Sequence, residues 1–81
     1  MFDPDRMRME RLRQRLSQKR LAEKIGSDQA HVSRIENGAL TNLEASTVEN
    51  IARALGCSMD YLCGLIDQPR YSQAAAEVAH G

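Results

Sequence analysis

A short segment of the chain, residues 28–37, carries side chains whose chemistry suits the edges of DNA bases. As a helix, it would present an outer face made of Gln29, Ala30, His31, Ser33 and Arg34. An arginine can donate two hydrogen bonds to guanine O6 and N7, and a glutamine amide can pair with adenine N6 and N7. The small residues among them permit close approach, so the pattern is typical of a surface that enters a DNA groove. An ordinary solvated helix face is the alternative.

The sequence contains no constellation for catalysis, for metal binding or for cofactor binding. His31 and His80 lack the neighbours that a metal site or an activated nucleophile needs, and no glycine-rich phosphate loop occurs. We therefore predict a protein that is not an enzyme and takes no metal and no cofactor. Cys57 and Cys63 are too few for a disulfide framework or a zinc site and are predicted to be small core residues. A redox- or ligand-gated sensor built on them is the alternative.

Charge is unevenly distributed along this chain of 81 residues, whose formal net charge is zero. Up to Arg34, nine basic and five acidic residues give a net charge of +4, and beyond it two basic and six acidic residues give −4. One half could therefore face a polyanion such as DNA. No apolar run approaches the roughly 20 residues of a membrane span, and the acidic N-terminus does not resemble a secretory signal, so we expect one cytoplasmic domain.

Helix caps and apolar periodicity predict an all-α chain. Three N-cap residues open helices in the first half, namely Asp5, Ser17 and Asp28. Gly26 ends the second of these helices, and Asn37-Gly38 ends the third. The apolar residues expected to face inward are Met9, Leu12 and Leu16, then Leu21, Ala22 and Ile25, then Val32 and Ile35.

Two further helices are predicted in the second half, after a loop at residues 39–42. A capping-box pattern at residues 46–49, beginning with Ser46, opens a helix that Gly56 ends, although Thr41 and Glu44 show the same spacing. Ser58 caps a short last helix. The inward residues expected here are Val48, Ile51, Ala52 and Leu55, then Met59, Leu62 and Cys63. Residues 67–81 are predicted to be a tail, either helical or disordered, that follows a domain at residues 1–66.

Two short helices joined by a tight turn that contains glycine are typical of a helix-turn-helix. In that motif the second helix presents its outer face to the major groove of DNA. The helices predicted on either side of Gly26-Ser27-Asp28 have this arrangement. The outer face of residues 28–37 is therefore the predicted reading surface.

Several motifs, in the same order, give this chain a resemblance to a known family. The stretches Leu16-Ser17-Gln18, Leu21 to Gly26, Val32 to Gly38 and Ile51 to Leu62 resemble the Cro/C1-type (XRE) helix-turn-helix family, from about Met7 to Leu65. The resemblance implies a compact five-helix, lambda-repressor-like DNA-binding domain. It also implies a transcription regulator, expected here to be a repressor, that binds a two-fold-symmetric operator as a dimer.

The resemblance further implies roles for individual residues. Arg11 and Glu36 match a pair that joins the first helix to the end of the third. The residues that match base-reading positions are Gln29, Ala30, Ser33 and Arg34. The residues expected at DNA phosphates are Gln18, which also braces the reading helix, and Asn37, together with Lys19, His31 and Arg13. The residues expected at the dimer interface are Met59, Tyr61, Leu62, Leu65 and Ile66.

The sequence departs from the family pattern at two places, the end of the first helix and the loop after the third. Arg15 stands where members often carry glycine, so the end of the first helix is expected to differ. The loop at residues 39–42 lacks the Lys or Arg that the family frequently has there, so backbone amides or other cations must hold phosphate. The candidates are Arg6, Arg8, Arg13 and Lys19. A protein-interaction module on the same fold, consistent with zero net charge, is the alternative function.

Overall fold

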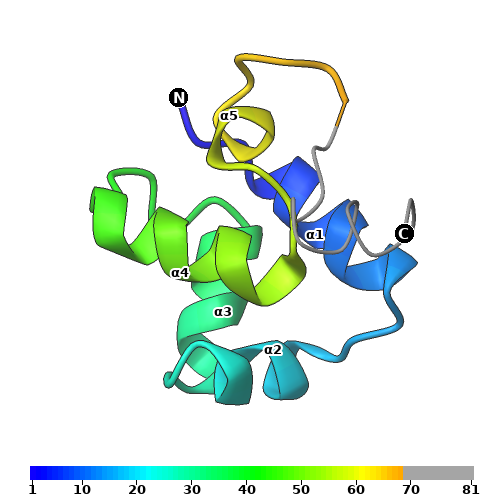
Figure 1. The fold of residues 1–81 in the computed structure, drawn as a ribbon. Helices are drawn as coiled ribbons and strands as arrows, with labels where there is room; N and C mark the ends of the chain where they lie inside the picture. The colour runs from blue at the N-terminus through cyan, green and yellow to red at the C-terminus, as the bar shows by residue number, and fades with distance from the viewer. Residues whose placement is uncertain (69–81) are drawn as a thin grey trace, which may run out of the picture.

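A computed structural model describes residues 1–68 of the chain. Within this range the helices are α1 (Pro4–Arg13), α2 (Gln18–Lys24), α3 (Gln29–Glu36), α4 (Ala45–Leu55) and α5 (Met59–Leu62), with no strand (Figure 1). The predicted all-α, five-helix fold is confirmed. Of the predicted tail at residues 67–81, all but the first two residues lie outside the described part. None of the helices between residues 1 and 68 has the length and apolar character needed to cross a membrane.

Helix α1 begins two residues earlier than the sequence predicts. Asp3, and not Asp5, is its N-cap, and the Asp3 carboxylate accepts hydrogen bonds from the backbone N–H groups of Asp5 and Arg6. Pro4 occupies the first helical position, where its fixed φ suits a helix and its missing N–H leaves no donor unsatisfied. The prediction of an Asp5 cap is wrong because a proline at this position requires the cap to precede it.

The buried face of α1 also differs from the predicted apolar stripe. Met9 and Leu12 are 66% and 55% exposed, and Leu16 lies beyond the end of the helix, where it packs against the core. The buried residues of α1 are Met7, Glu10 and Arg11. The prediction is wrong because it considered apolar residues alone, whereas the two charged residues of this face are each paired with a residue of opposite charge.

Helices α2 and α3 form the predicted helix-turn-helix. Ser17 and Asp28 cap them as expected, each accepting a hydrogen bond from a backbone N–H in the first turn. The turn between them contains Gly26 at a φ of +69°, a left-handed conformation that favours glycine. The residues that fill the space between the two helices are Leu21, Ala22, Val32 and Ile35, as predicted, and Ile25 is half-buried.

Helix α4 has the predicted inner face but a different start. Val48, Ile51, Ala52 and Leu55 are buried, and Gly56 ends the helix at a φ of +68°. The predicted capping box at Ser46 is wrong, because the N-cap is Glu44, whose side chain makes no capping hydrogen bond. The alternative spacing, from Thr41 to Glu44, therefore ends at the residue that is the N-cap, but neither spacing forms a capping box.

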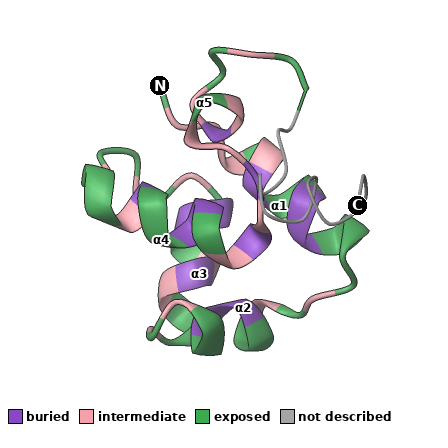
Figure 2. Cartoon of the chain, viewed as in Figure 1, coloured by how far each residue is buried: buried purple, intermediate pink, exposed green. Residues whose placement is uncertain are grey.

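Helix α5 packs beside the N-terminal segment of the chain. The backbone N–H of Asp3 donates to the Leu62 carbonyl at 2.7 Å, and the N-terminal ammonium donates to the Cys63 carbonyl at 3.1 Å. Ser58 caps α5 as predicted, and Leu62 is completely buried, whereas Met59 and Cys63 are half-buried. Buried residues of all five helices form one core (Figure 2). The hydrogen bonds between the N-terminal segment and α5 hold the two ends of the domain together beside this core.

Candidate nucleic-acid interface

The residues predicted to read bases share the solvent-facing side of α3. Gln29, Ala30 and Arg34 are exposed and Ser33 is half-buried, whereas Val32 and Ile35 on the opposite side are in the core. The Arg34 side chain forms no ion pair or hydrogen bond with any residue between 1 and 68, so its guanidinium donors are available to a ligand, whereas its backbone carbonyl accepts from the Ala39 and Leu40 N–H groups. The face therefore combines an unpaired cation, an amide and two small residues.

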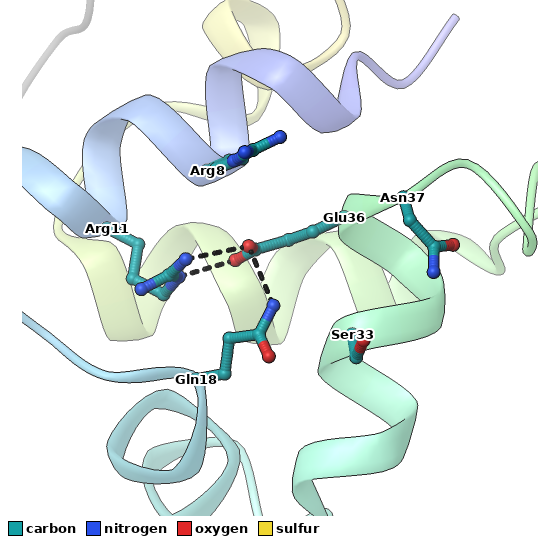
Figure 3. Close-up of a pocket in the computed structure, with 6 residues that line it drawn as sticks. All are labelled: Arg8, Arg11, Gln18, Ser33, Glu36 and Asn37. Atoms are coloured by element: carbon teal, nitrogen blue, oxygen red, sulfur yellow. Dashed lines mark hydrogen bonds and ion pairs between the residues drawn. The ribbon is translucent and has the colours of Figure 1, made fainter.

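A buried ionic network holds α3 against α1 and α2 (Figure 3). The Arg11 guanidinium donates to both carboxylate oxygens of Glu36, with N–O distances of 2.6 and 2.9 Å, and to the Leu16 carbonyl at 2.7 Å. The side chains of Arg11 and Glu36 are 8% and 3% exposed. Gln18 adds a bond from its Nε2 to Glu36 Oε1 at 3.2 Å. The network thus fixes the orientation of the α3 face relative to the rest of the domain.

Beside this network lies a cleft of about 260 Å³ between α1, α2 and α3. It is lined by Arg8, Arg11, Gln18, Ser33, Glu36 and Asn37. The side-chain oxygen of Asn37 accepts a bond from the Ala39 N–H at 3.0 Å, which leaves its NH₂ group as a free donor. Two of the predicted phosphate residues, Gln18 and Asn37, are therefore brought together next to the α3 face.

The other predicted phosphate residues lie in different surroundings. Lys19 is exposed on α2, and the His31 Nδ1 is 2.7 Å from the Ser27 hydroxyl oxygen at the start of α3. Arg13 instead pairs with the buried Glu10, and its charge acts on Cys57 in the core. The position of Arg13 beside Glu10 and Cys57 separates it from the cleft.

Among residues 1–68, the basic side chains that lack an ion-pair partner all lie in the first half of the chain. Within residues 1–68, the lysines and arginines that form no ion pair are Arg8, Arg15, Lys19, Lys24 and Arg34. Beyond Arg34, the sole basic residue in the described part is Arg53, which pairs with Glu49 at 2.6 Å. The net charge of zero is thus the sum of two oppositely charged halves of the chain. The half that contains the helix-turn-helix is the positive one.

The two cysteines occupy different environments and are both free thiols. Cys57 is buried, and its burial, with Glu10 nearby, raises the pKa of the thiol from 9.0 to about 11. A thiol with a raised pKa is a poor nucleophile, which argues against Cys57 as a redox sensor. Among residues 1–68, no group of three or more His, Cys, Asp or Glu side chains is placed to hold a metal ion.

The residues predicted to form a dimer interface do not all reach the surface. Leu62 is 0% exposed and belongs to the core, so it is not available for contact with a second subunit. Met59 and Tyr61 are half-buried against the core, and the guanidinium carbon of Arg6 lies 4.7 Å from the centre of the Tyr61 ring. Leu65 is 71% exposed and Ile66 is half-buried.

Sequence reasoning missed two polar elements that shape this region. Glu10 is buried, where Arg13 and Gln14 bond to its carboxylate, and Gln14 also donates to the Leu55 carbonyl at 2.6 Å. The i+3 and i+4 spacing of Arg13 and Gln14 from Glu10 was the available signal. The second missed element is the hydrogen bond that the Asn37 side-chain oxygen accepts from the Ala39 N–H. The tendency of asparagine to form an Asx turn after a helix was the signal that could have indicated it.

Comparisons with known proteins agree with this geometry. The family model described as Helix-turn-helix matches residues 7–62. The structure is similar to SinR, a master regulator for biofilm formation solved in complex with DNA, with a TM-score of 0.71 and 28% identity over 74% of this chain and 95% of that one. It is also similar to a hypothetical transcription factor, NHTF, from Neisseria, with a TM-score of 0.69 and 29% identity over 93% of this chain and 78% of that one.

A third similar structure is the P22 c2 repressor in complex with a synthetic operator, with a TM-score of 0.69. Its identity of 24%, over 76% of this chain and 92% of that one, supports a likeness of fold. A search of curated protein sequences finds no significant match. The lambda-repressor-like architecture expected from the sequence is therefore confirmed by solved structures.

Proposed function

The chain belongs to the Cro/C1-type helix-turn-helix family, and from this premise we propose that it is a DNA-binding transcription regulator that reads its operator with α3. The observation that carries the proposal is the exposed α3 face, where the Arg34 side chain has no partner among residues 1–68 and Gln29 stands five residues before it. Arg34 would donate to guanine and Gln29 would pair with adenine. The family and the fold are those of DNA-binding regulators, which supports the proposal that the protein is not an enzyme and acts in the cytoplasm.

Phosphate contacts would position α3 in the major groove. Gln18, Asn37 and Lys19 lie on or beside the cleft side of the helix-turn-helix, and His31 lies at the start of α3. The first amides of α2 add backbone donors near Gln18, since helix N-termini attract anions. These contacts supply affinity that falls with salt, whereas the bases supply the sequence preference.

The experiment that tests base reading is selection of random DNA duplexes by the purified protein and by two variants. Arg34→Ala should relax the preference at one position in each half-site, with a loss of roughly 1–3 kcal/mol in discrimination. Arg53→Ala removes the same charge from α4, outside the helix-turn-helix, and should leave the selected sequence unchanged. Failure of the wild-type protein to enrich any sequence at moderate salt would contradict the proposal.

We propose further that the protein acts as a homodimer and represses transcription at a two-fold-symmetric operator, with half-sites roughly 34 Å apart. The surface that supports a dimer is around α5, where Leu65 is 71% exposed and Met1, bonded to the Cys63 carbonyl, is 95% exposed. Of the interface residues predicted from the sequence, those that remain candidates are Met59, Tyr61, Leu65 and Ile66.

Measurement of mass at micromolar concentration, with and without operator DNA, tests the dimer. Leu65→Glu should shift the protein toward the monomer, because it places a charge in the proposed apolar contact. Met9→Glu alters a residue of similar exposure on α1 and serves as the control. A wild-type protein that remains monomeric under both conditions would contradict the dimer without affecting the proposal of base reading.

A protein-interaction module is the second candidate function. It is favoured by the zero net charge and by an apolar pocket of about 400 Å³ between the N-terminal segment, the loop before α4 and α5. The pocket lining includes Met1, Phe2, Leu43, Val48, Met59 and Cys63. DNA binding with no steep dependence on salt would favour this function over operator recognition.

A further inference from the structure

The four arginines of α1 have different roles in the structure. Arg6 is committed to the α5 side, where it donates to the Tyr61 carbonyl at 2.9 Å and to the Ile66 carbonyl and pairs with Asp3. Arg11 is neutralised by Glu36, and Arg13 pairs with Glu10. Arg8 is exposed, lines the cleft and has no ion pair with any residue in the range 1–68.

The cleft beside Arg8 presents hydrogen-bond donors. Figure 3 shows Arg8 on α1 and Asn37 at the end of α3 on either side of it. The Asn37 oxygen is already bonded to the Ala39 N–H, so its NH₂ group remains to donate, and the Ser33 hydroxyl can also donate. Because Arg11 and Glu36 cancel each other, the net charge of the cleft is that of Arg8. This chemistry selects an anion with several acceptor oxygens.

We propose that this cleft binds one phosphate of the DNA backbone, with Arg8 as its charged ligand and Asn37 as a second donor. The inference rests on the proposed function and extends it, because it assigns a phosphate-binding residue to α1, outside the helix-turn-helix. Ser33 belongs both to the reading face and to the cleft lining. A phosphate held in the cleft would therefore flank the bases that α3 contacts, and it would fix the register of α3 along the groove.

Arg8→Ala tests the proposal, with Arg53→Ala as the variant that removes an equal charge from α4, outside the lining of the cleft. Binding to the selected duplex and to a scrambled duplex is measured by fluorescence anisotropy over a range of KCl concentrations. Arg8→Ala should weaken binding to both duplexes by a similar factor, roughly tenfold, because a phosphate contact carries no sequence information. The slope of log K against log salt should fall by about 0.9 for each protomer bound. Arg53→Ala should change neither quantity.

A second measurement locates the phosphate. A series of selected duplexes, each with one neutral methylphosphonate in place of a backbone phosphate, is titrated with the wild-type protein and with Arg8→Ala. One position in each half-site should weaken the wild type but leave Arg8→Ala nearly unaffected, because the variant has already lost that contact. Arg8→Ala should keep the melting temperature of the wild type, since its side chain is exposed and unpaired.

The outcomes separate this inference from the proposed function. If the wild type binds DNA with a steep salt dependence and Arg8→Ala behaves like Arg53→Ala, the cleft assignment is wrong and base reading by α3 stands. If every methylphosphonate affects the wild type and Arg8→Ala equally, Arg8 contributes only to the overall electrostatic potential of the surface and contacts no single phosphate. The assignment is then again wrong. If the wild type does not bind DNA, both proposals fail.

Discussion

The first three helices and the last two are stabilised in different ways. In α1–α3 the buried residues include the charged residues Glu10, Arg11 and Glu36, of which Arg11 and Glu36 pair with each other and Glu10 pairs with the exposed Arg13. In α4 and α5 the buried residues are apolar, among them Ile51, Leu55 and Leu62. A buried ion pair adds little to net stability compared with an apolar pair, but it restricts the geometry that satisfies it. We infer that the ionic network sets the orientation of α3, whereas the stability comes mainly from the apolar core that all five helices share.

The same two regions differ in surface charge. Unpaired cations lie on α1, on the turn that follows it, and on α2 and α3, whereas residues 39–68 carry Glu44, Glu49, Asp60 and Asp67 against a paired Arg53. A polyanion would therefore approach the molecule from the helix-turn-helix side. The neutral total is compatible with DNA binding because the two charges are spatially separated.

The largest expected effect is on the ionic network of the first region. Glu36→Ala leaves the Arg11 guanidinium buried without its carboxylate, so the free energy of unfolding should fall by about 3–5 kcal/mol in urea titrations. Glu49→Ala removes a carboxylate of the exposed pair on α4 and should cost about 0.5 kcal/mol or less. Equal losses in the two variants would contradict the different roles of the two regions.

Cys57, in the apolar region, should make stability depend on alkaline pH. The folded protein keeps the thiol proton up to its pKa of about 11, whereas a thiol in the unfolded chain loses its proton near 9. The unfolded state therefore binds fewer protons between these values, and the free energy of unfolding should fall with rising pH by up to about 1.4 kcal/mol per unit. Cys57→Ala should remove this contribution and Cys63→Ala should keep it. Identical pH profiles for wild type and Cys57→Ala would show that burial does not hold the proton.

The two regions also differ in how α2 and α4 begin. Ser17 accepts a capping bond at the start of α2, whereas Glu44 makes none at the start of α4. Ser17→Ala should destabilise the protein by about 1 kcal/mol, and Glu44→Ser should stabilise it by a similar or smaller amount by adding the missing cap. Thermal melts of the two variants measure the changes. A destabilised Glu44→Ser protein would indicate that the Glu44 side chain has a role other than capping.

The smallest expected effect concerns the end of α1. Arg15 has a φ of +59°, whereas the other described residues with positive φ are glycines, including Gly56 and Gly64 in the second region. Arg15→Gly relieves the left-handed strain but adds freedom to the unfolded chain, so a net gain of about 0.5 kcal/mol is expected.

A comparison of Arg15→Gly with Arg15→Asn separates the effect of backbone strain on stability from the effect of the lost charge on DNA binding. Arg15→Gly and Arg15→Asn both remove one unpaired cation from the positive side, so both should weaken DNA binding if Arg15 contributes to the field. Only Arg15→Gly should show the full gain in stability, although asparagine tolerates this conformation better than arginine. Weaker stability in Arg15→Gly would mean that the arginine side chain makes a stabilising contact that outweighs its backbone strain.

Local features of the sequence determined much of the fold. Ser17, Asp28 and Ser58 were recognised as caps, and the inner face of α4 was predicted correctly. A cap bonds to a backbone N–H within three residues of it, and the inner face of one helix repeats every three or four residues. Such signals can be read from a short window, so the helix-turn-helix and the α3 face were predictable, and the family resemblance added the expected roles.

Only the tertiary structure decided which charged residues are buried and which remain free. Arg11 finds Glu36 25 residues away, and Gln14 reaches the Leu55 carbonyl across 41 residues. These partners place Glu10 and Arg11 in the core and leave Met9 and Leu12 in solvent, against the apolar pattern. The tertiary structure also pairs Arg13 with Glu10 and leaves Arg8 without an ion pair among residues 1–68. The sequence alone does not distinguish these two arginines. Burial of a charge depends on a partner brought close by packing, and no local window contains that information.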